Sequence, residues 1–294
     1  MSTTTIGGSL VALVTPFDAE GVDESALRRL VNWHIDQGTD GLVPVGTTGE
    51  SATLSEEEHR QVVDIVVDET NGRIPVVAGA GSNNPQEAIT YSNYAAQSGA
   101  DAALHVAGYY VRPNQAGLYE HFRMVHDATE LPIIVYNIPP RAIVDILPET
   151  LADIAGLPRV IGVKDATGDL ARPLLERQVI RRPFAFLSGE DATAVAYNVS
   201  GGTGCISVTA NVAPAICAAM QRACADGDYA TAARLQDRLL PLHMAMFAEP
   251  SPAGAKFAVS LLGHCGPDCR PPIMPLSDAT RERIRAAMGA LELI

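Results

Sequence analysis

Only two of the 21 basic side chains in this chain of 294 residues are lysines, Lys164 and Lys256. A primary amine can attack a ketone to form an imine, which then withdraws electrons from the neighbouring carbon. Lys164 directly follows the apolar run 160–163, and burial disfavours the charged form of an amine. The alternative is a lysine that reaches solvent or pairs with Asp165. Lys256 lies in an Ala-rich helical stretch, so we favour Lys164 as the nucleophile.

Three other polar groups follow apolar runs. Tyr136 carries a phenol that can relay protons, although a tyrosine there can also simply pack its ring. Thr47 and Thr48 lie between two glycines, where hydroxyl and N–H groups can bind a carboxylate or merely form a turn. Arg141 can bind a second carboxylate through two hydrogen bonds or stay solvated in its loop.

The sequence does not favour metal chemistry. His264, Cys265 and Cys269 lack the C-x-x-C spacing, and no second cysteine pair completes a tetrahedral site. Four of the seven histidines fall in expected helices, at positions 34, 59, 121 and 126, and His105 lies inside an expected strand. We therefore expect neither a metal nor any other cofactor.

Eight short apolar runs recur along the chain, and most lack polar alternation, as in strands buried on both faces. They span 9–17, 41–46, 75–81, 102–108, 132–137, 160–166, 185–189 and 205–209. Helical signals lie between them, including the capping box from Ser55 to Glu58, and Pro85 and Pro148 in first turns.

This alternation predicts a (β/α)8 TIM barrel over residues 1–226. A C-terminal helical extension over 227–294 is expected to hold helices at 228–247, 251–263 and 277–291. The competing fold, a doubly wound open sheet, usually carries G-x-G-x-x-G after its first strand, which is missing here.

Barrel enzymes place their chemistry at the carboxyl ends of the strands. Thr47, Tyr110, Tyr136 and Lys164 all stand at such ends. The seventh strand is followed by two acidic residues at 190–191, which disfavour a phosphorylated substrate.

The composition restricts the partners. A net charge of −13 and a pI near 4.9 argue against binding to nucleic acid or to an anionic membrane. No apolar run approaches the roughly 20 residues of a membrane span. The N-terminus lacks the basic region of a secretory signal, and Cys205, Cys217 and Cys224, in apolar surroundings, are best explained as buried, reduced thiols. We expect a cytoplasmic protein with small-molecule substrates.

Five motifs occur together in a fixed order: 46-GTTGES-51, 109-YY-110 before Arg112-Pro113, 136-YNIPPR-141, 161-IGVKDATG-168 and 206-ISVTANV-212. With them the chain resembles, over essentially its whole length, the pyruvate-dependent class I aldolases typified by dihydrodipicolinate synthase and N-acetylneuraminate lyase. The resemblance implies the same barrel with a helical tail, no metal, and an imine between Lys164 and pyruvate.

The resemblance also implies roles for seven further residues. Thr47, Tyr136 and Tyr110 would form a proton relay, Thr48 would bind the pyruvate carboxylate, and Arg141 would bind the carboxylate of the second substrate. Gly189 and Ile206 would line the pocket. Because Tyr110 would reach into a neighbouring subunit, a homotetramer built as a dimer of dimers is implied.

Within the family, the threonine pair and Arg141 resemble the synthase branch, and Ala142 departs from it by lacking a hydroxyl. The implied reaction condenses pyruvate with L-aspartate-4-semialdehyde to 4-hydroxy-tetrahydrodipicolinate, in lysine and diaminopimelate biosynthesis. The alternative is an aldolase or dehydratase acting on 2-keto-3-deoxy sugar acids or N-acetylneuraminate.

Many enzymes of this branch are inhibited by lysine at a subunit interface. Matching positions here are Ala52, Glu56, His59, Gly81, Asn83, Glu87 and Tyr109. Glu56 stands where some lysine-sensitive members carry a histidine. A carboxylate there can attract an ammonium group or distort the site, so inhibition by lysine is left open.

Overall fold

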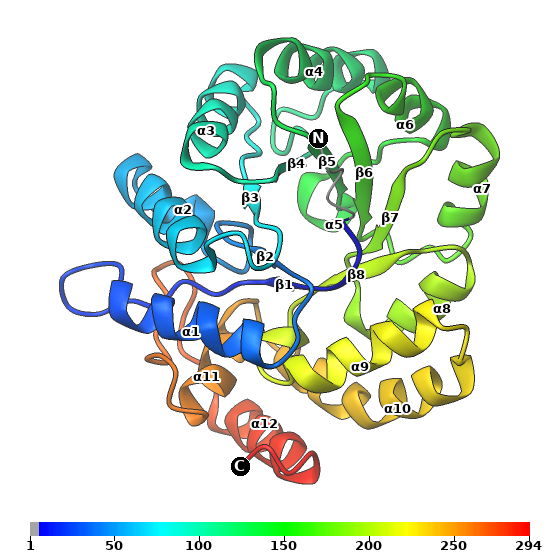
Figure 1. The fold of residues 1–294 in the computed structure, drawn as a ribbon. Helices are drawn as coiled ribbons and strands as arrows, with labels where there is room; N and C mark the ends of the chain where they lie inside the picture. Colours follow the sequence, from blue (N-terminus) through cyan, green and yellow to red (C-terminus); the bar gives the residue numbers. More distant parts are fainter. Residues whose placement is uncertain (1–5) are drawn as a thin grey trace.

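The computed structural model describes residues 6–294, which form a closed barrel of eight strands (Figure 1). The strands are β1 (Gly8–Ala12), β2 (Gly41–Val43), β3 (Val77–Gly79), β4 (Ala102–Val106), β5 (Ile133–Asn137), β6 (Val160–Asp165), β7 (Ala185–Ser188) and β8 (Gly204–Ser207). Their order is β2-β1-β8-β7-β6-β5-β4-β3, and every pairing is parallel. A bridge between Leu42 and Val76 joins the two ends of this order. The barrel is therefore confirmed, and the open sheet is excluded.

A ring of helices surrounds the barrel (Figure 1). The helices that follow the first six strands are α1 (Glu24–Asp36), α2 (Glu56–Thr70), α3 (Pro85–Ser98), α4 (Gln115–Ala128), α5 (Pro139–Ala142), α6 (Pro148–Ala155) and α7 (Arg172–Val179). After β7 and β8 come α8 (Ala194–Val199) and α9 (Pro214–Ala225), with short 3₁₀ turns η1 (Ser51–Thr53), η2 (Asp191–Thr193) and η3 (Thr209–Asn211). The expected starts are confirmed, because Ser55 and Glu58 form a capping box, and Pro85 and Pro148 stand in first turns.

Apolar side chains fill two layers. An inner cluster lies inside the barrel and includes Leu10, Ile134, Leu187 and Ile206. Outer clusters lie between the strands and the helical ring. Successive side chains of a strand point to opposite faces, so each strand is buried on both sides, which explains its unbroken apolar sequence.

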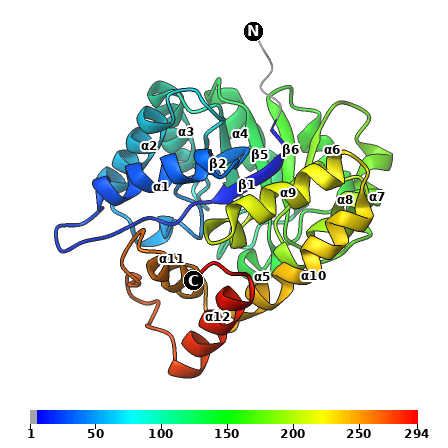
Figure 2. The same ribbon diagram turned by 60° about the horizontal axis from the view of Figure 1, so that its bottom comes forward.

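The C-terminal residues form three more helices, α10 (Tyr229–Met246), α11 (Ala253–Leu261) and α12 (Asp278–Ala290). Figure 2 shows α11 and α12 gathered beneath one side of the barrel. Their apolar residues, such as Phe257 and Ile284, share one core cluster with Val11 of β1 and Val31 of α1. The tail is therefore packed on the barrel as part of one structure.

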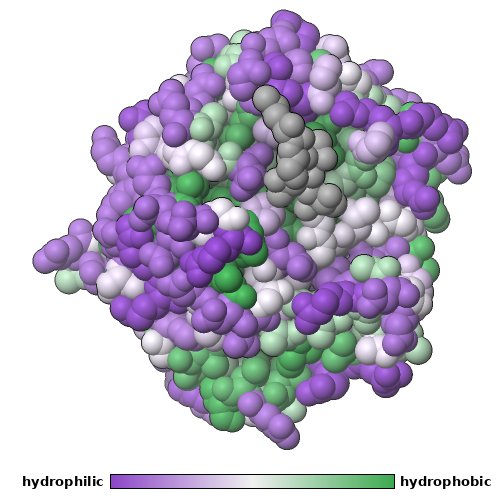
Figure 3. All heavy atoms as spheres, viewed as in Figure 1, coloured by the Kyte–Doolittle hydropathy of each residue, from purple (hydrophilic) through white to green (hydrophobic). Residues whose placement is uncertain are grey.

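The surface is mixed in character. Figure 3 shows hydrophilic side chains over most of the helical ring and an apolar area at the bottom of the view, where α9 and α12 lie in Figure 1. None of the helices in residues 6–294 combines the length and the apolarity needed to span a bilayer.

Candidate active site

Lys164 and Tyr136 lie side by side on neighbouring strands inside the barrel. The two residues are paired in the register of β5 and β6, and the Nζ atom of Lys164 lies 4.2 Å from the centroid of the Tyr136 ring. They are only 6% and 7% exposed. The ion pairs of the described residues include Lys256 but not Lys164. The amine of Lys164 thus has an aromatic face beside it and no carboxylate partner.

The space around Lys164 depends on a glycine. A Cβ atom at Gly189, just after β7, would lie 3.1 Å from Cε of Lys164 and 2.9 Å from Cβ of Ala166. Leu187, which pairs with Lys164 in the strand register, and Ile206 of β8 complete the apolar wall as members of the inner cluster. Gly189 therefore lies close to the Lys164 side chain, and Ile206 belongs to the apolar cluster inside the barrel.

The Thr47–Thr48 turn follows β2 and is closed by hydrogen bonds to its backbone carbonyls. The Glu50 N–H donates to the Thr47 carbonyl at 3.1 Å, and the hydroxyl of Thr15 donates to the Gly49 carbonyl at 2.7 Å. Thr47 is exposed, whereas Thr48 is buried. A small residue is needed beneath the turn, because a Cβ at Gly79 would lie 2.2 Å from the Val45 carbonyl oxygen.

Lys256, the second lysine, is fully buried and occupied. Its Nζ lies 2.9 Å from Oε1 of Glu50 and 4.1 Å from the centroid of the Phe17 ring. The other Glu50 oxygen accepts the Arg270 N–H at 2.8 Å. Lys256 therefore neutralises a carboxylate of the turn that carries Thr47 and Thr48. Sequence reasoning missed this role of Glu50, although the residue stands inside the 46–51 motif.

Tyr110 stands in the segment after β4 and is exposed over 89% of its surface. Its φ of 65° and the φ of 50° at Arg112 are both in the left-handed region, which non-glycine residues rarely adopt. Tyr109 and Val111 beside it are also exposed, at 36% and 60%. The segment thus presents an apolar and aromatic surface in a strained backbone conformation.

Arg141 lies on α5, a single turn directly after β5, and its side chain is exposed. Ala142 is buried, and Ile143 ends the turn with a φ of 65°. Five of the seven non-glycine residues with positive φ follow β2, β4 or β5: Val45, Glu50, Tyr110, Arg112 and Ile143. Backbone strain is often concentrated at functional sites.

Sequence reasoning also missed a set of buried carboxyl groups behind the strand ends. Asp191 accepts hydrogen bonds from the Ser207 hydroxyl and from the N–H groups of Val208 and Thr209, at 2.9 and 3.1 Å. It thereby ties the loop after β7 to the end of β8. Its placement after a strand was the only signal in the sequence.

Asp165 points away from Lys164, on the outer face of β6. It accepts the Thr167 N–H at 2.8 Å, and burial raises its pKa. Glu176 of α7 is 1% exposed, and burial, followed by the negative charge of Asp165, raises the pKa of its carboxyl group to about 8. An ion pair between Lys164 and Asp165, the alternative left open above, is not formed.

The positions matched to a lysine site gather near the start of α2 and of α3. His59 is buried, stacks on Tyr91 with ring centroids 4.2 Å apart, and its Nε2 lies 2.9 Å from the Gly79 carbonyl oxygen. Burial raises the pKa of Tyr91, with smaller contributions from Glu87, Glu56 and Tyr109. Glu56 is already paired with Arg60. Ala52 lies in the 3₁₀ turn η1 before α2, and Gly81 and Asn83 lie on the loop before α3.

No group of three or more histidine, cysteine or acidic side chains within residues 6–294 is arranged to hold a metal ion. The five cysteines of that part of the chain are unpaired. His105 is fully buried, and burial lowers its pKa to about 3.

Comparison with known proteins gives one consistent result. The model of the dihydrodipicolinate synthetase family matches residues 5–291. The chain is 56% identical over 281 residues to the 4-hydroxy-tetrahydrodipicolinate synthase of Rhodospirillum centenum, covering 96% of this chain and 97% of that protein.

Two solved structures show the same architecture over nearly all of both chains. The chloride-inhibited dihydrodipicolinate synthase of Acinetobacter baumannii, complexed with pyruvate, is 42% identical with a TM-score of 0.96, covering 99% of this chain and 100% of that one. The enzyme of Cyanidioschyzon merolae, with lysine bound, is 34% identical with a TM-score of 0.95, covering 98% and 99%.

Proposed function

The chain belongs to the dihydrodipicolinate synthetase family, and we propose that it works through an imine between Lys164 and pyruvate. It is a lyase of lysine and diaminopimelate biosynthesis, with the 4-hydroxy-tetrahydrodipicolinate synthase activity of its relatives. The observation that carries the imine is the amine of Lys164, which is buried beside the Tyr136 ring without a carboxylate partner. The other lysine is held in an ion pair.

The chemistry follows from a primary amine inside an apolar barrel. The Lys164 nitrogen attacks the keto carbon of pyruvate, and loss of one water gives the imine. Removal of a methyl proton gives an enamine, whose carbon bonds to the aldehyde carbon of aspartate semialdehyde. The amino group of that substrate then attacks the imine carbon, closes the ring and releases the Lys164 amine. No step requires a metal or another cofactor.

The remaining residues supply protons and charge. Tyr136, beside Lys164, with Thr47 and Tyr110, moves protons to and from the keto oxygen. Thr48 in its turn binds the pyruvate carboxylate, and Arg141 on the rim binds the carboxylate of the aldehyde. Gly189 leaves room for the imine, and Ile206 forms part of the apolar wall.

A second copy of the chain completes this site. Tyr110 is 89% exposed and stands beside exposed Val111 and Tyr109, an arrangement suited to burial against a partner. The proposed assembly is a homotetramer made of two dimers. Within each dimer, each subunit places its Tyr110 in the active site of the other.

Lysine is the proposed regulator, bound near His59. The charges of Glu56 and Glu87 act on both His59 and Tyr91 and would attract an ammonium group, and a relative has been solved with lysine bound. The reaction rate should fall as the lysine concentration rises, and the inhibition should be evident at millimolar lysine. A flat curve would remove the regulatory role and leave the catalytic site untouched.

The direct experiment is a rate assay with pyruvate and aspartate semialdehyde, coupled to an NADPH-dependent reductase that consumes the product. Brisk turnover is expected. Absence of turnover with pyruvate still trapped by borohydride would keep the imine and point to a sugar-acid acceptor.

Borohydride trapping followed by peptide mapping tests the nucleophile. Reduction of the imine should attach pyruvate to Lys164, and Lys164→Ala should abolish the adduct. The chain offers one other lysine side chain, so an adduct that persists in this variant and maps to Lys256 would overturn the assignment.

A further inference from the structure

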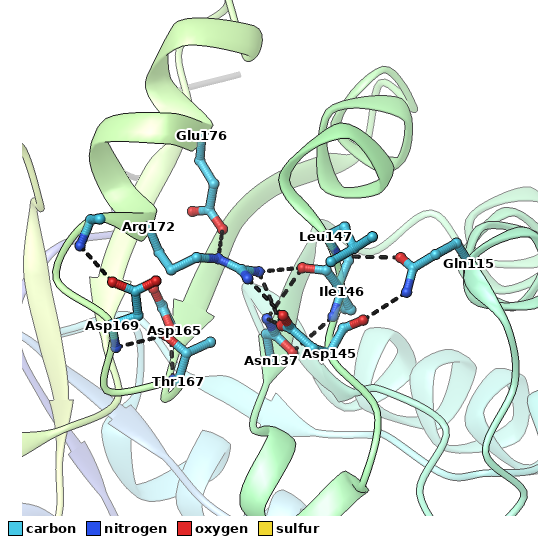
Figure 4. Close-up of polar contacts among 11 residues, drawn as sticks. Gln115, Asn137, Asp145, Ile146, Leu147, Asp165, Thr167, Asp169, Arg172 and Glu176 are labelled. Carbon is cyan, nitrogen blue, oxygen red and sulfur yellow. Dashed lines mark hydrogen bonds and ion pairs between the residues drawn. The ribbon is translucent and has the colours of Figure 1, made fainter.

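A buried polar network lies behind the ends of β5 and β6, on the outer side of the barrel. Figure 4 shows the guanidinium of Arg172 between the carboxylates of Glu176 and Asp145. Nη1 of Arg172 lies 2.7 Å from Oδ2 of Asp145, and Nη2 lies 3.1 Å from Oδ1. The same guanidinium donates to the Ile146 carbonyl. Arg172 is 6% exposed, so these contacts are shielded from water.

Residues 145–147 are also held by two other elements. Asn137, the last residue of β5, donates its amide to Oδ1 of Asp145 at 2.8 Å and accepts the Ile146 N–H at 3.2 Å. Gln115, the first residue of α4, donates to the Asp145 carbonyl at 2.8 Å and accepts the Leu147 N–H at 3.1 Å. Side chains from α4, β5 and α7 thus converge on three consecutive residues.

These three residues are the stem of the loop that carries Arg141. The loop leaves the barrel at Asn137, directly after Tyr136, and returns at Asp145 to 147 before α6. Between these two anchors only Arg141 presents a cation, on an exposed single turn. A bidentate guanidinium–carboxylate pair fixes both distance and orientation, which a single point charge does not.

Glu176 also contacts the guanidinium of Arg172, but less closely than Asp145 does. Its Oε1 lies 3.5 Å from Nε of Arg172, and its Oε2 is buried without a partner among residues 6–294. Burial raises the pKa of the Glu176 carboxyl group to about 8, which favours its neutral form. Asp145 is therefore the main charged partner of Arg172.

We propose that Arg172 is a positioning residue that holds the stem 145–147 and thereby sets Arg141 where it receives the carboxylate of the second substrate. This role rests on the function proposed for Arg141. Arg172 itself touches neither substrate. Its loss should affect the aldehyde substrate and spare imine formation, because Lys164 and Tyr136 are held by the strand register.

The test is the separation of the two Michaelis constants in Arg172→Met. The KM for aspartate semialdehyde should rise about tenfold, whereas the KM for pyruvate and the amount of borohydride-trapped pyruvate should stay within about twofold. Arg172→Lys keeps the charge but loses the bidentate geometry of the guanidinium. Its KM for aspartate semialdehyde should lie between those of the unchanged protein and of Arg172→Met. Arg177→Gln is the matched control, because Arg177 lies on the same helix and donates only to the Ser200 carbonyl.

A double variant distinguishes a positioning role from a general loss of structure. In the Arg141→Ala background, Arg172→Met should raise the KM for the aldehyde no further, because the residue acts through Arg141. Equal increases in both Michaelis constants, or additive effects in the double variant, would overturn the proposal. If Arg172→Met fails to fold, Asp145→Asn tests the same pair from its other side and should also raise the KM for the aldehyde alone. The Asp145 side chain is 36% exposed, so this substitution disturbs the core less. An Arg141→Ala variant with an unchanged KM for the aldehyde would instead refute the role proposed for Arg141.

Discussion

The two lysines of this chain show how surroundings decide what a side chain does. Lys164 lies beside an aromatic ring and an apolar wall, whereas Lys256 lies 2.9 Å from a buried carboxylate. The amine in the first setting is the proposed nucleophile. The amine in the second is held by its contact with Glu50. We thus propose a chemical role for one lysine, whereas the other has a structural role.

Glu176 should make the stability of the protein depend on pH. Its folded pKa of about 8 lies above the ordinary value of 4.5, so the native chain keeps a proton that the unfolded chain releases. The stabilisation that this bound proton gives is fully present below pH 4.5 and is lost as the pH rises toward 8. The free energy of unfolding should therefore fall between these limits, by up to roughly 1.4 kcal/mol per pH unit.

Urea denaturation of the protein and of Glu176→Gln across this range measures the effect. The free energy of unfolding of the variant should fall less steeply, because its amide has no proton to lose. Glu120→Gln, at an exposed position of α4, is the control and should follow the unchanged protein. Curves for Glu176→Gln that run parallel to those of the unchanged protein would contradict the assignment.

At the scale of the elements, the segments after the strands carry the strain, and Ile143 is the clearest case. A β-branched residue with a φ of 65° is strained, and its side chain is 63% exposed, so little packing compensates. Ile143→Gly should raise the free energy of unfolding by roughly 1 kcal/mol, from about 1–3 kcal/mol of relieved strain less about 0.5–1 kcal/mol of added chain entropy.

The comparison variant is Ile143→Ala. It removes the branched side chain but keeps a Cβ in the left-handed region, so it should stabilise the protein less than the glycine does. Thermal denaturation of both variants tests whether the left-handed backbone at position 143 is strained. An alanine variant at least as stable as the glycine variant would show that it is not.

Much of the fold follows from local patterns in the sequence, and its departures have local causes. The run 41–46 predicted a longer second strand than β2, which ends at Val43 because Pro44 has no N–H to donate and Val45 takes a φ of 49°. The turn α5 was not anticipated, since two prolines in a row give no helical periodicity.

The predicted site residues were found from strand ends and motifs, but the residues that support them were not. Glu50 and Lys256 are 206 positions apart, and Arg172 and Asp145 are 27 apart. Nothing in local spacing indicates which carboxylate a buried cation will meet. Such pairs emerge only once the barrel is closed and its helices are packed.

At the scale of the whole molecule, the exposed Tyr110 makes subunit exchange testable. Tyr110→Phe should fold normally and lose at least about tenfold in kcat, since a positioned proton donor contributes roughly 10²–10⁴-fold. Tyr229→Phe, at a tyrosine of α10 that is 40% exposed, is the matched control.

Mixed oligomers give the decisive measurement. A Lys164→Ala subunit supplies Tyr110 to its neighbour, and a Tyr110→Phe subunit supplies Lys164, so one site of each mixed pair is complete. Random mixing should restore roughly a quarter of the activity of the unchanged protein. No recovery on mixing would mean that Tyr110 does not serve the neighbouring site.

The C-terminal segment supports the turn at residues 46–51, which carries Thr47 and Thr48 of the candidate site. Lys256 of α11 and the Arg270 backbone both bind Glu50, and Arg270 also pairs with Glu58 at the start of α2. Glu50 itself has a φ of 60°, a conformation that these contacts stabilise. Removing Lys256 leaves a buried carboxylate without its cation.

Lys256→Met should therefore lower the free energy of unfolding by roughly 3–5 kcal/mol, the usual effect of breaking a buried ion pair from one side. The double variant Glu50→Gln with Lys256→Met should be less destabilised than the sum of the single variants, because neither side then leaves an unpaired charge. Arg123→Met removes a cation from exposed pairs on α4, and its loss should cost under about 1 kcal/mol. Urea denaturation of the two single variants, the double variant and Arg123→Met provides the four values. If the Lys256 variant were no less stable than the Arg123 variant, the tail would pack on the barrel through apolar contacts alone. The turn that carries Thr47 and Thr48 would then owe its shape to the hydrogen bonds that the Thr15 hydroxyl and the Glu50 N–H donate to its carbonyls.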